Sequence, residues 1–147
     1  MARARILDDI GEDAVRAAVR ASGAWASDAA ADATHADDAA DAADADHAVS
    51  RDTMATAVRY LLQLLAEEAP GNTVEMRVPP FGAVQCIEGP RHTRGTPPNV
   101  IETDAATWLA LATGNVSWAD ALASGRVHAS GQRADLTGRL PVLAQPK

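Results

Sequence analysis

The sequence predicts an α+β fold, in which helices pack on one face of a mostly antiparallel sheet and one further helix precedes this domain. Two long segments repeat apolar residues at steps of three and four, which is the pattern of helices with a buried face. Later segments are short, alternate apolar and polar residues, and are separated by Pro and Gly, which is typical of strands and turns. Helices and strands in this order form an α+β domain.

The first predicted element is an amphipathic helix within residues 1–26, running from about Asp8 to Trp25. Charged residues occupy one side of it and apolar residues the other, so we expect the apolar side to dock on another element. The apolar residues are Leu7, Ile10, Ala14, Val15, Ala18 and Val19.

Residues 27–49 consist largely of alanine and aspartate. This stretch carries seven aspartates and no Lys or Arg, whereas the whole chain has 13 basic and 20 acidic residues and a formal net charge of −7. The remainder is therefore balanced. Aspartates repel one another, and no large apolar side chain is present to offset the entropy lost on ordering. We expect a flexible acidic linker, whose charge offers a docking surface to a protein partner.

The third unit, residues 50–147, begins with a strongly predicted helix. Ser50 is a good N-cap, and Pro70-Gly71 ends the helix. Nearly all other positions are apolar, so we expect the helix to be buried around most of its circumference. Its polar residues form one narrow stripe: Asp52, Thr56, Arg59, Gln63 and Glu67.

For the rest of this unit, the sequence predicts short strands and helices. Asp104 and Ser117 stand where helix N-caps are expected, and Gly114 and Gly125 where those two helices end. The expected order is a strand over 73–78, a strand over 81–87, a polar loop over 88–99, a strand over 100–102, the two capped helices, a strand over 126–130, and a short helix or turn over 135–143.

Several classes of protein are excluded by what the sequence lacks. Cys86 is the only cysteine, so no intramolecular disulfide can form and a reducing compartment is expected. The N-terminus has no apolar core of a signal peptide, and no apolar run reaches the roughly 18–20 residues that span a bilayer. No strong basic field is present to bind nucleic acid. We expect a cytoplasmic protein with no integral membrane segment.

Two stretches resemble a known family. Residues 103–131 read Thr-Asp plus a helix, Gly114, a second short helix, Ser-Gly125, a strand and Gly131, which is similar to the C-terminal half of sterol carrier proteins. Residues 78–99 resemble a bacterial, largely actinobacterial, branch of that family. The resemblance implies a sandwich of sheet and helices around an apolar cavity for sterols, fatty acids or acyl-CoA. It implies no catalytic residue and no cofactor.

The apolar excess suggests which side chains would line such a cavity. From the residues alone a solid core is the commoner outcome, and the resemblance is what favours a cavity. The candidate ligand-binding residues are Leu61, Leu65, Trp108, Leu111, Leu122, Leu136 and Leu140.

The loop holds a second candidate site, formed by Arg91, His92 and Arg94. Guanidinium groups pair with carboxylate or phosphate, so these residues could anchor an anionic head group. Alternatively, the arginines bind Glu88, Glu102 or backbone carbonyls and simply hold the loop in place.

Neither a metal site nor a catalytic site is predicted. The four histidines, His35, His47, His92 and His128, have no metal-ligand spacing, and Cys86 is predicted to be a core residue.

The first hypothesis is therefore a non-catalytic carrier of a lipid or other hydrophobic small molecule. The alternatives are an accessory domain or subunit of an enzyme that handles an anionic or acyl substrate through the Arg91/His92/Arg94 loop, and a protein-interaction module that uses the first helix and the acidic linker.

Overall fold

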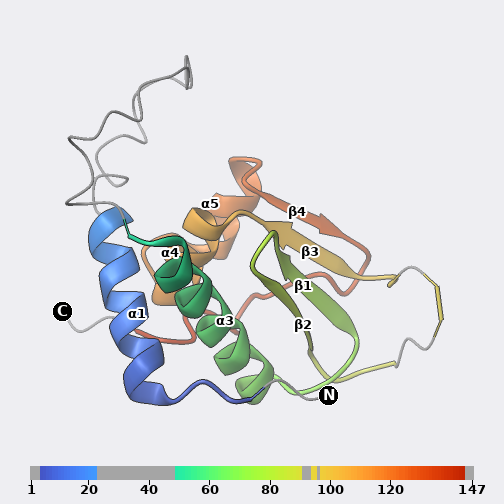
Figure 1. Ribbon diagram of the computed structural model, residues 1–147. Helices are drawn as coiled ribbons and strands as arrows, with labels where there is room; N and C mark the ends of the chain where they lie inside the picture. The colour runs from blue at the N-terminus through green and yellow to red at the C-terminus, as the bar shows by residue number, and fades with distance from the viewer. Residues whose placement is uncertain (1–3, 23–48, 91–93, 96, 145–147) are drawn as a thin grey trace.

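The computed structural model of the chain describes residues 4–22, 49–90, 94–95 and 97–144 (Figure 1). Nearly all of the predicted acidic linker, 27–49, lies outside the described residues. So do Arg91 and His92 of the predicted anion site.

Helix α1 (Asp8–Ala21) confirms the predicted N-terminal helix, although the described helix ends earlier than Trp25. It runs antiparallel to α3 (Arg51–Glu68) and packs against it with Ala14, Val15 and Ala18 (Figure 1). The apolar stripe therefore docks on the rest of the fold, as expected.

The two helices approach closely at Gly11. A Cβ atom on this residue would lie 2.2 Å from ring carbons of Tyr60, which is itself fully buried. The Tyr60 hydroxyl donates a hydrogen bond to Asp8 Oδ1 at 3.2 Å, and burial together with this bond raises the pKa of Tyr60 to about 12. Only glycine leaves room for this tyrosine under α1.

Helix α3 begins as predicted, because the Ser50 hydroxyl accepts a hydrogen bond from the Thr53 amide at 3.1 Å. It lies between α1 and the sheet, and it also contacts α4. Most of its apolar side chains are buried, which confirms the prediction of burial around most of the circumference.

Four strands form one sheet in the order β2-β1-β3-β4: β1 (Val74–Val78), β2 (Gly82–Cys86), β3 (Val100–Thr103) and β4 (Val127–Ser130). Two of the three pairings are antiparallel, which confirms a mostly antiparallel sheet, and β1 pairs with β3 in parallel. The parallel pair follows from the loop after β2. Strand β2 ends opposite Val74 and β3 begins opposite Glu75, so the loop starts and finishes at the same end of the sheet.

The strands bury one face only. Val74, Met76 and Val78 point into the core, whereas Glu75 and Arg77 lie on the opposite, half-exposed face and form an ion pair with Nε 2.6 Å from Oε1. Helices thus cover one face of the sheet, as predicted.

Helices α4 (Ala105–Thr113) and α5 (Trp118–Ala123) have the predicted caps. Asp104 Oδ1 accepts from the Thr107 amide at 2.8 Å, and the Ser117 hydroxyl accepts from the Asp120 amide at 3.1 Å. Residues 135–143, predicted as a short helix or turn, form turns that pack against the core.

Candidate ligand-binding pocket

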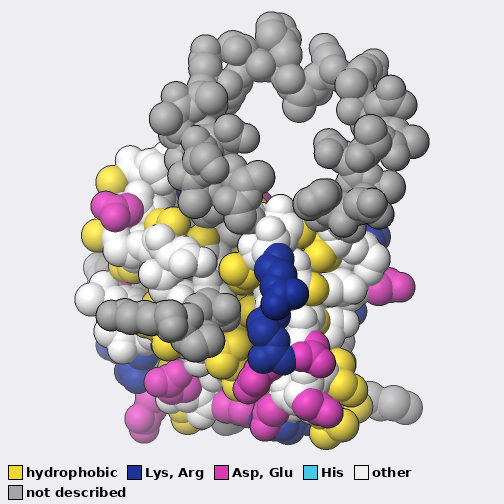
Figure 2. Space-filling model, turned by 90° about the vertical axis from the view of Figure 1, so that its left-hand side faces the viewer, with side chains coloured by type: hydrophobic (Ala, Val, Ile, Leu, Met, Phe, Trp, Pro, Cys, Tyr) yellow, Lys and Arg dark blue, Asp and Glu magenta, His cyan; other side chains and the backbone are white. Residues whose placement is uncertain are grey.

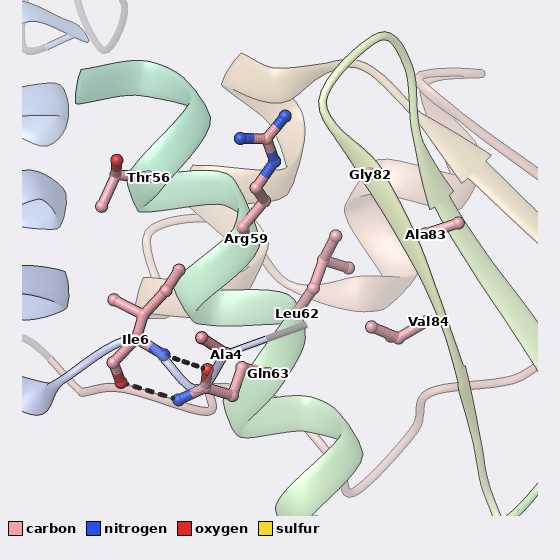
Figure 3. A pocket seen from close by; sticks show the side chains of 9 residues that line it. All are labelled: Ala4, Ile6, Thr56, Arg59, Leu62, Gln63, Gly82, Ala83 and Val84. Atoms are coloured by element: carbon pink, nitrogen blue, oxygen red, sulfur yellow. Dashed lines mark hydrogen bonds between the residues drawn. The ribbon is translucent and has the colours of Figure 1, made fainter. Parts of the chain in front are cut away.

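An open pocket of about 540 Å³ lies between α3, β2 and the segment that precedes α1 (Figure 3). Three parts of the chain that are distant in sequence meet here. The lining residues are Ala4, Ile6, Thr56, Arg59, Leu62, Gln63, Gly82, Ala83 and Val84.

The apolar part of the pocket is formed by Leu62, Val84 and Ile6. Leu62 is buried in α3, and Val84 points toward it from β2, while Ala83 points away (Figure 3). This surface is suited to an apolar chain or ring, because apolar atoms gain free energy when they leave water.

The polar part comes from the narrow stripe of α3. Arg59 Nε donates a hydrogen bond to the carbonyl oxygen of Phe81 at 2.8 Å, which ties the helix to the turn between β1 and β2. The guanidinium carbon of Arg51 lies 5.7 Å from the centroid of the Phe81 ring, a cation–π contact. The stripe predicted on α3 therefore faces a pocket and its rim.

The segment Ala4–Ile6 forms one wall. The Ile6 amide donates to Gln63 Oε1 at 2.8 Å, and Gln63 Nε2 donates back to the Ile6 carbonyl at 3.0 Å (Figure 3). Arg5 forms ion pairs with Glu67 at 2.9 Å and with Asp8 at 3.0 Å, and these side chains are about half exposed. The side-chain amide of Gln63 thus holds the backbone of Ile6 as a neighbouring strand would.

The structure does not gather the seven predicted ligand-binding residues around one pocket. Five of them have no accessible surface, Leu61, Leu65, Trp108, Leu111 and Leu136. A cavity that held water or ligand would give its walls accessible surface, so these five pack as a solid core, and a ligand could reach them only if the core opened. Leu140 is half-buried against the core, and Leu122 is exposed beside β4. Their role in binding stays a prediction.

Of the predicted anion site, the structure describes only Arg94, which is exposed. Both ends of the loop that carries it are anchored. The Thr73 hydroxyl donates to the Pro90 carbonyl at 3.1 Å. Asn99 is buried and bridges two segments: its Nδ2 donates to the Thr73 carbonyl at 3.1 Å, and its Oδ1 accepts from the Arg133 amide at 3.0 Å.

We expect Asn99→Leu to lower the free energy of unfolding by about 1–3 kcal/mol, because it leaves the Thr73 carbonyl and the Arg133 amide without their partner. Urea denaturation followed by circular dichroism measures the change. The control is Arg94→Ala, an exposed residue of the same loop, which should stay within about 0.5 kcal/mol of the parent. Equal stability of the two variants would contradict the anchoring role of Asn99.

Cys86 is buried on the inner face of β2, as predicted for a core residue. Burial raises the pKa of its thiol to about 11, so the thiol is protonated at neutral pH and is a poor nucleophile. Within the described part of the chain, no group of three His, Cys, Asp or Glu side chains could hold a metal ion.

Sequence reasoning missed the pocket residues. One signal was visible, namely the polar stripe that includes Arg59 and Gln63 on a helix that is otherwise buried. Such a stripe is usually taken as the solvent-facing side, and nothing in the sequence brings Ile6 or Val84 to it.

Comparison with known proteins adds the family. A family model described as "bacterial SCP ortholog" matches residues 50–142, which is more than half of the chain. A search of curated proteins returned no match. No helix among the described residues has the length and apolar character needed to cross a membrane. The matched span covers α3, the whole sheet, α4 and α5, and it agrees with the α+β architecture described above. The chain therefore belongs to the family of bacterial sterol carrier protein (SCP) orthologs.

Proposed function

We propose that the chain is a non-catalytic binding or carrier protein for a lipid or another hydrophobic small molecule, which it holds in the pocket between α3 and β2. The observation that carries the proposal is the apolar surface of the partly buried Ile6 and Val84, above the buried Leu62, inside an open pocket of a sterol-carrier-like fold. The pocket volume of about 540 Å³ falls within the roughly 300–1,000 Å³ of small-molecule sites.

The polar groups of the pocket support binding better than catalysis. Gln63 is occupied by the backbone of Ile6, and Arg59 Nε by the carbonyl of Phe81. These side chains hold the walls in place, and Thr56 is the other polar side chain on the lining. The buried, protonated thiol of Cys86 supports the same reading and fits a reducing compartment, for which we propose the cytoplasm.

Two finer parts of the proposal concern residues away from this pocket. Leu61, Leu65, Trp108 and Leu111 would join the site only for a ligand that opens the core. Arg94, with its loop neighbours Arg91 and His92, would contact an anionic head group that projects from a bound ligand.

We expect Val84→Trp to reduce binding of a fluorescently labelled long-chain fatty acid by about tenfold or more, because the indole fills the space opposite Leu62. Gln85→Trp is the matched control, since the neighbouring side chain is exposed on the opposite face of β2 and should leave binding unchanged. Fluorescence titration measures both variants, and native mass spectrometry of the purified protein reports any lipid that it retains. Absence of fatty-acid binding and of retained lipid would contradict the proposed function.

A further inference from the structure

The wall formed by Ala4, Arg5 and Ile6 is attached differently from the helix that follows it. Helix α1 is held by side chains with little or no accessible surface, such as Val15 and Ala18. The preceding segment is held to α3 by the part-buried hydrogen bonds between Ile6 and Gln63 and by the exposed ion pair of Arg5 with Glu67, while the partly buried side chain of Ile6 packs against the core. Exposed ion pairs contribute little to stability and are weakened by salt.

The chain changes conformation between these two parts. Leu7 has extended backbone angles (φ −67°, ψ 145°), its side chain caps no amide of α1, and it is 59% exposed. The first hydrogen bond of the helix runs from the Gly11 amide to the Leu7 carbonyl at 2.9 Å. Rotation at Leu7 can therefore move residues 4–6 without breaking a hydrogen bond within α1 or exposing its buried face.

Release of this segment would widen the opening of the pocket on the side of α1. Ala4 and Ile6 close the side of the pocket that faces α1, opposite the strand residues Gly82 and Val84 (Figure 3). They lie before the matched span of residues 50–142. Figure 2, which views the molecule from the side of α1, shows acidic side chains gathered at the end where this helix begins, beside hydrophobic ones.

We propose that residues 4–6 are a releasable wall: they detach from α3 while α1 stays docked, and a ligand enters and leaves the pocket by this route. The inference rests on the proposed function for its ligand, but the release itself is a property of the chain alone. The side-chain amide of Gln63 is the main contact that holds the segment in place, because it hydrogen-bonds to both the amide and the carbonyl of Ile6. The Arg5 ion pairs add a contribution that salt weakens.

Hydrogen exchange followed by NMR tests the release without any ligand. The Ile6 amide donates to Gln63, so its exchange rate measures how often this hydrogen bond opens. The exchange rate of the amide of the buried Val15 measures undocking of α1. We expect Ile6 to exchange faster than Val15 in the parent protein. Gln63→Leu should speed exchange at Ile6 by about tenfold and leave Val15 unchanged. Gln85→Leu, the same substitution at an exposed position outside the pocket, should change neither.

Stopped-flow fluorescence with the labelled fatty acid tests the route. Gln63→Leu should raise both the association and the dissociation rate, and change the dissociation constant less than either rate. Arg5→Gln should raise the rates at low salt and match the parent at high salt.

Exchange of Ile6 in step with Val15 would overturn the release, whether or not the fatty acid binds. Binding rates that are the same in the parent and in Gln63→Leu would overturn the route. Separate exchange of Ile6 with no fatty-acid binding would support the release and contradict the proposed function.

Discussion

Replacement of Trp108 by alanine is expected to lower the free energy of unfolding by about 3–5 kcal/mol. The indole has no accessible surface, and its Nε1 donates a hydrogen bond to the Val58 carbonyl of α3 at 3.3 Å. The substitution removes a large packed side chain and leaves a void between α4 and α3 that the surrounding core can close only in part. Chemical denaturation monitored by circular dichroism gives the change.

The Trp108→Ala variant also distinguishes the two interpretations of Trp108 from the sequence, as a residue of a solid core or as a residue that lines a ligand cavity. Replacement of a packed core residue lowers the free energy of unfolding by the full amount, whereas replacement of a residue that lines a ligand cavity lowers it by less, because fewer atoms surround the side chain. Leu122→Ala is the control: Leu122 belongs to the same predicted set but is 40% exposed, so its loss should stay near 0.5 kcal/mol. A loss of less than about 1 kcal/mol for Trp108→Ala would contradict solid packing at this position.

Gly11→Leu is expected to destabilise the protein by about 3 kcal/mol and to displace α1 from α3. Leucine favours helix over glycine by somewhat less than 1 kcal/mol, so the intrinsic preference of the helix works in the opposite direction. The destabilisation comes from steric contact alone, since even a Cβ atom added at this position would lie 2.2 Å from the Tyr60 ring. Because α1 positions Ile6, fatty-acid binding should weaken as well.

Two comparisons isolate this contact. Arg16→Leu places the same side chain at an exposed position of α1, where it should cost little. Tyr60→Ala in the Gly11→Leu background opens the space beneath the helix, so the double variant should lose less stability than the sum of the losses of the two single variants. Additive losses would show that Gly11 and Tyr60 do not act through their contact.

The local elements could be predicted from the sequence because their causes are local. Ser50, Asp104 and Ser117 accept hydrogen bonds from amides three residues ahead, so each helix start is encoded within one turn. The alternation over residues 74–78 likewise determines which face of β1 is buried. The parallel pairing of β1 with β3 arises because the long loop after β2 finishes at the end of the sheet where it starts, and no local pattern records that path.

The pocket could not be predicted for the same reason. Successive residues of a helix point about 100° apart, so Leu61 and Leu62 face different neighbours although both are buried leucines of one apolar run. The sequence indicates that α3 is buried on most sides but does not indicate which neighbour covers each side. Both leucines belong to the core, and Leu62 but not Leu61 also lies at the base of the pocket because of the angles at which α1 and β2 dock.

The sequence by itself determined the α+β class, the helix caps, the charge balance of residues 50–147 and the likeness to sterol carrier proteins. These depend on composition and on spacings within a few residues. Only the tertiary structure decided that five of the seven predicted ligand-lining residues are fully buried and that the polar stripe of α3 faces a pocket. The reason is physical: a cavity is space left between elements that are distant in sequence, and its position depends on how Ile6, Gln63 and Val84 come together.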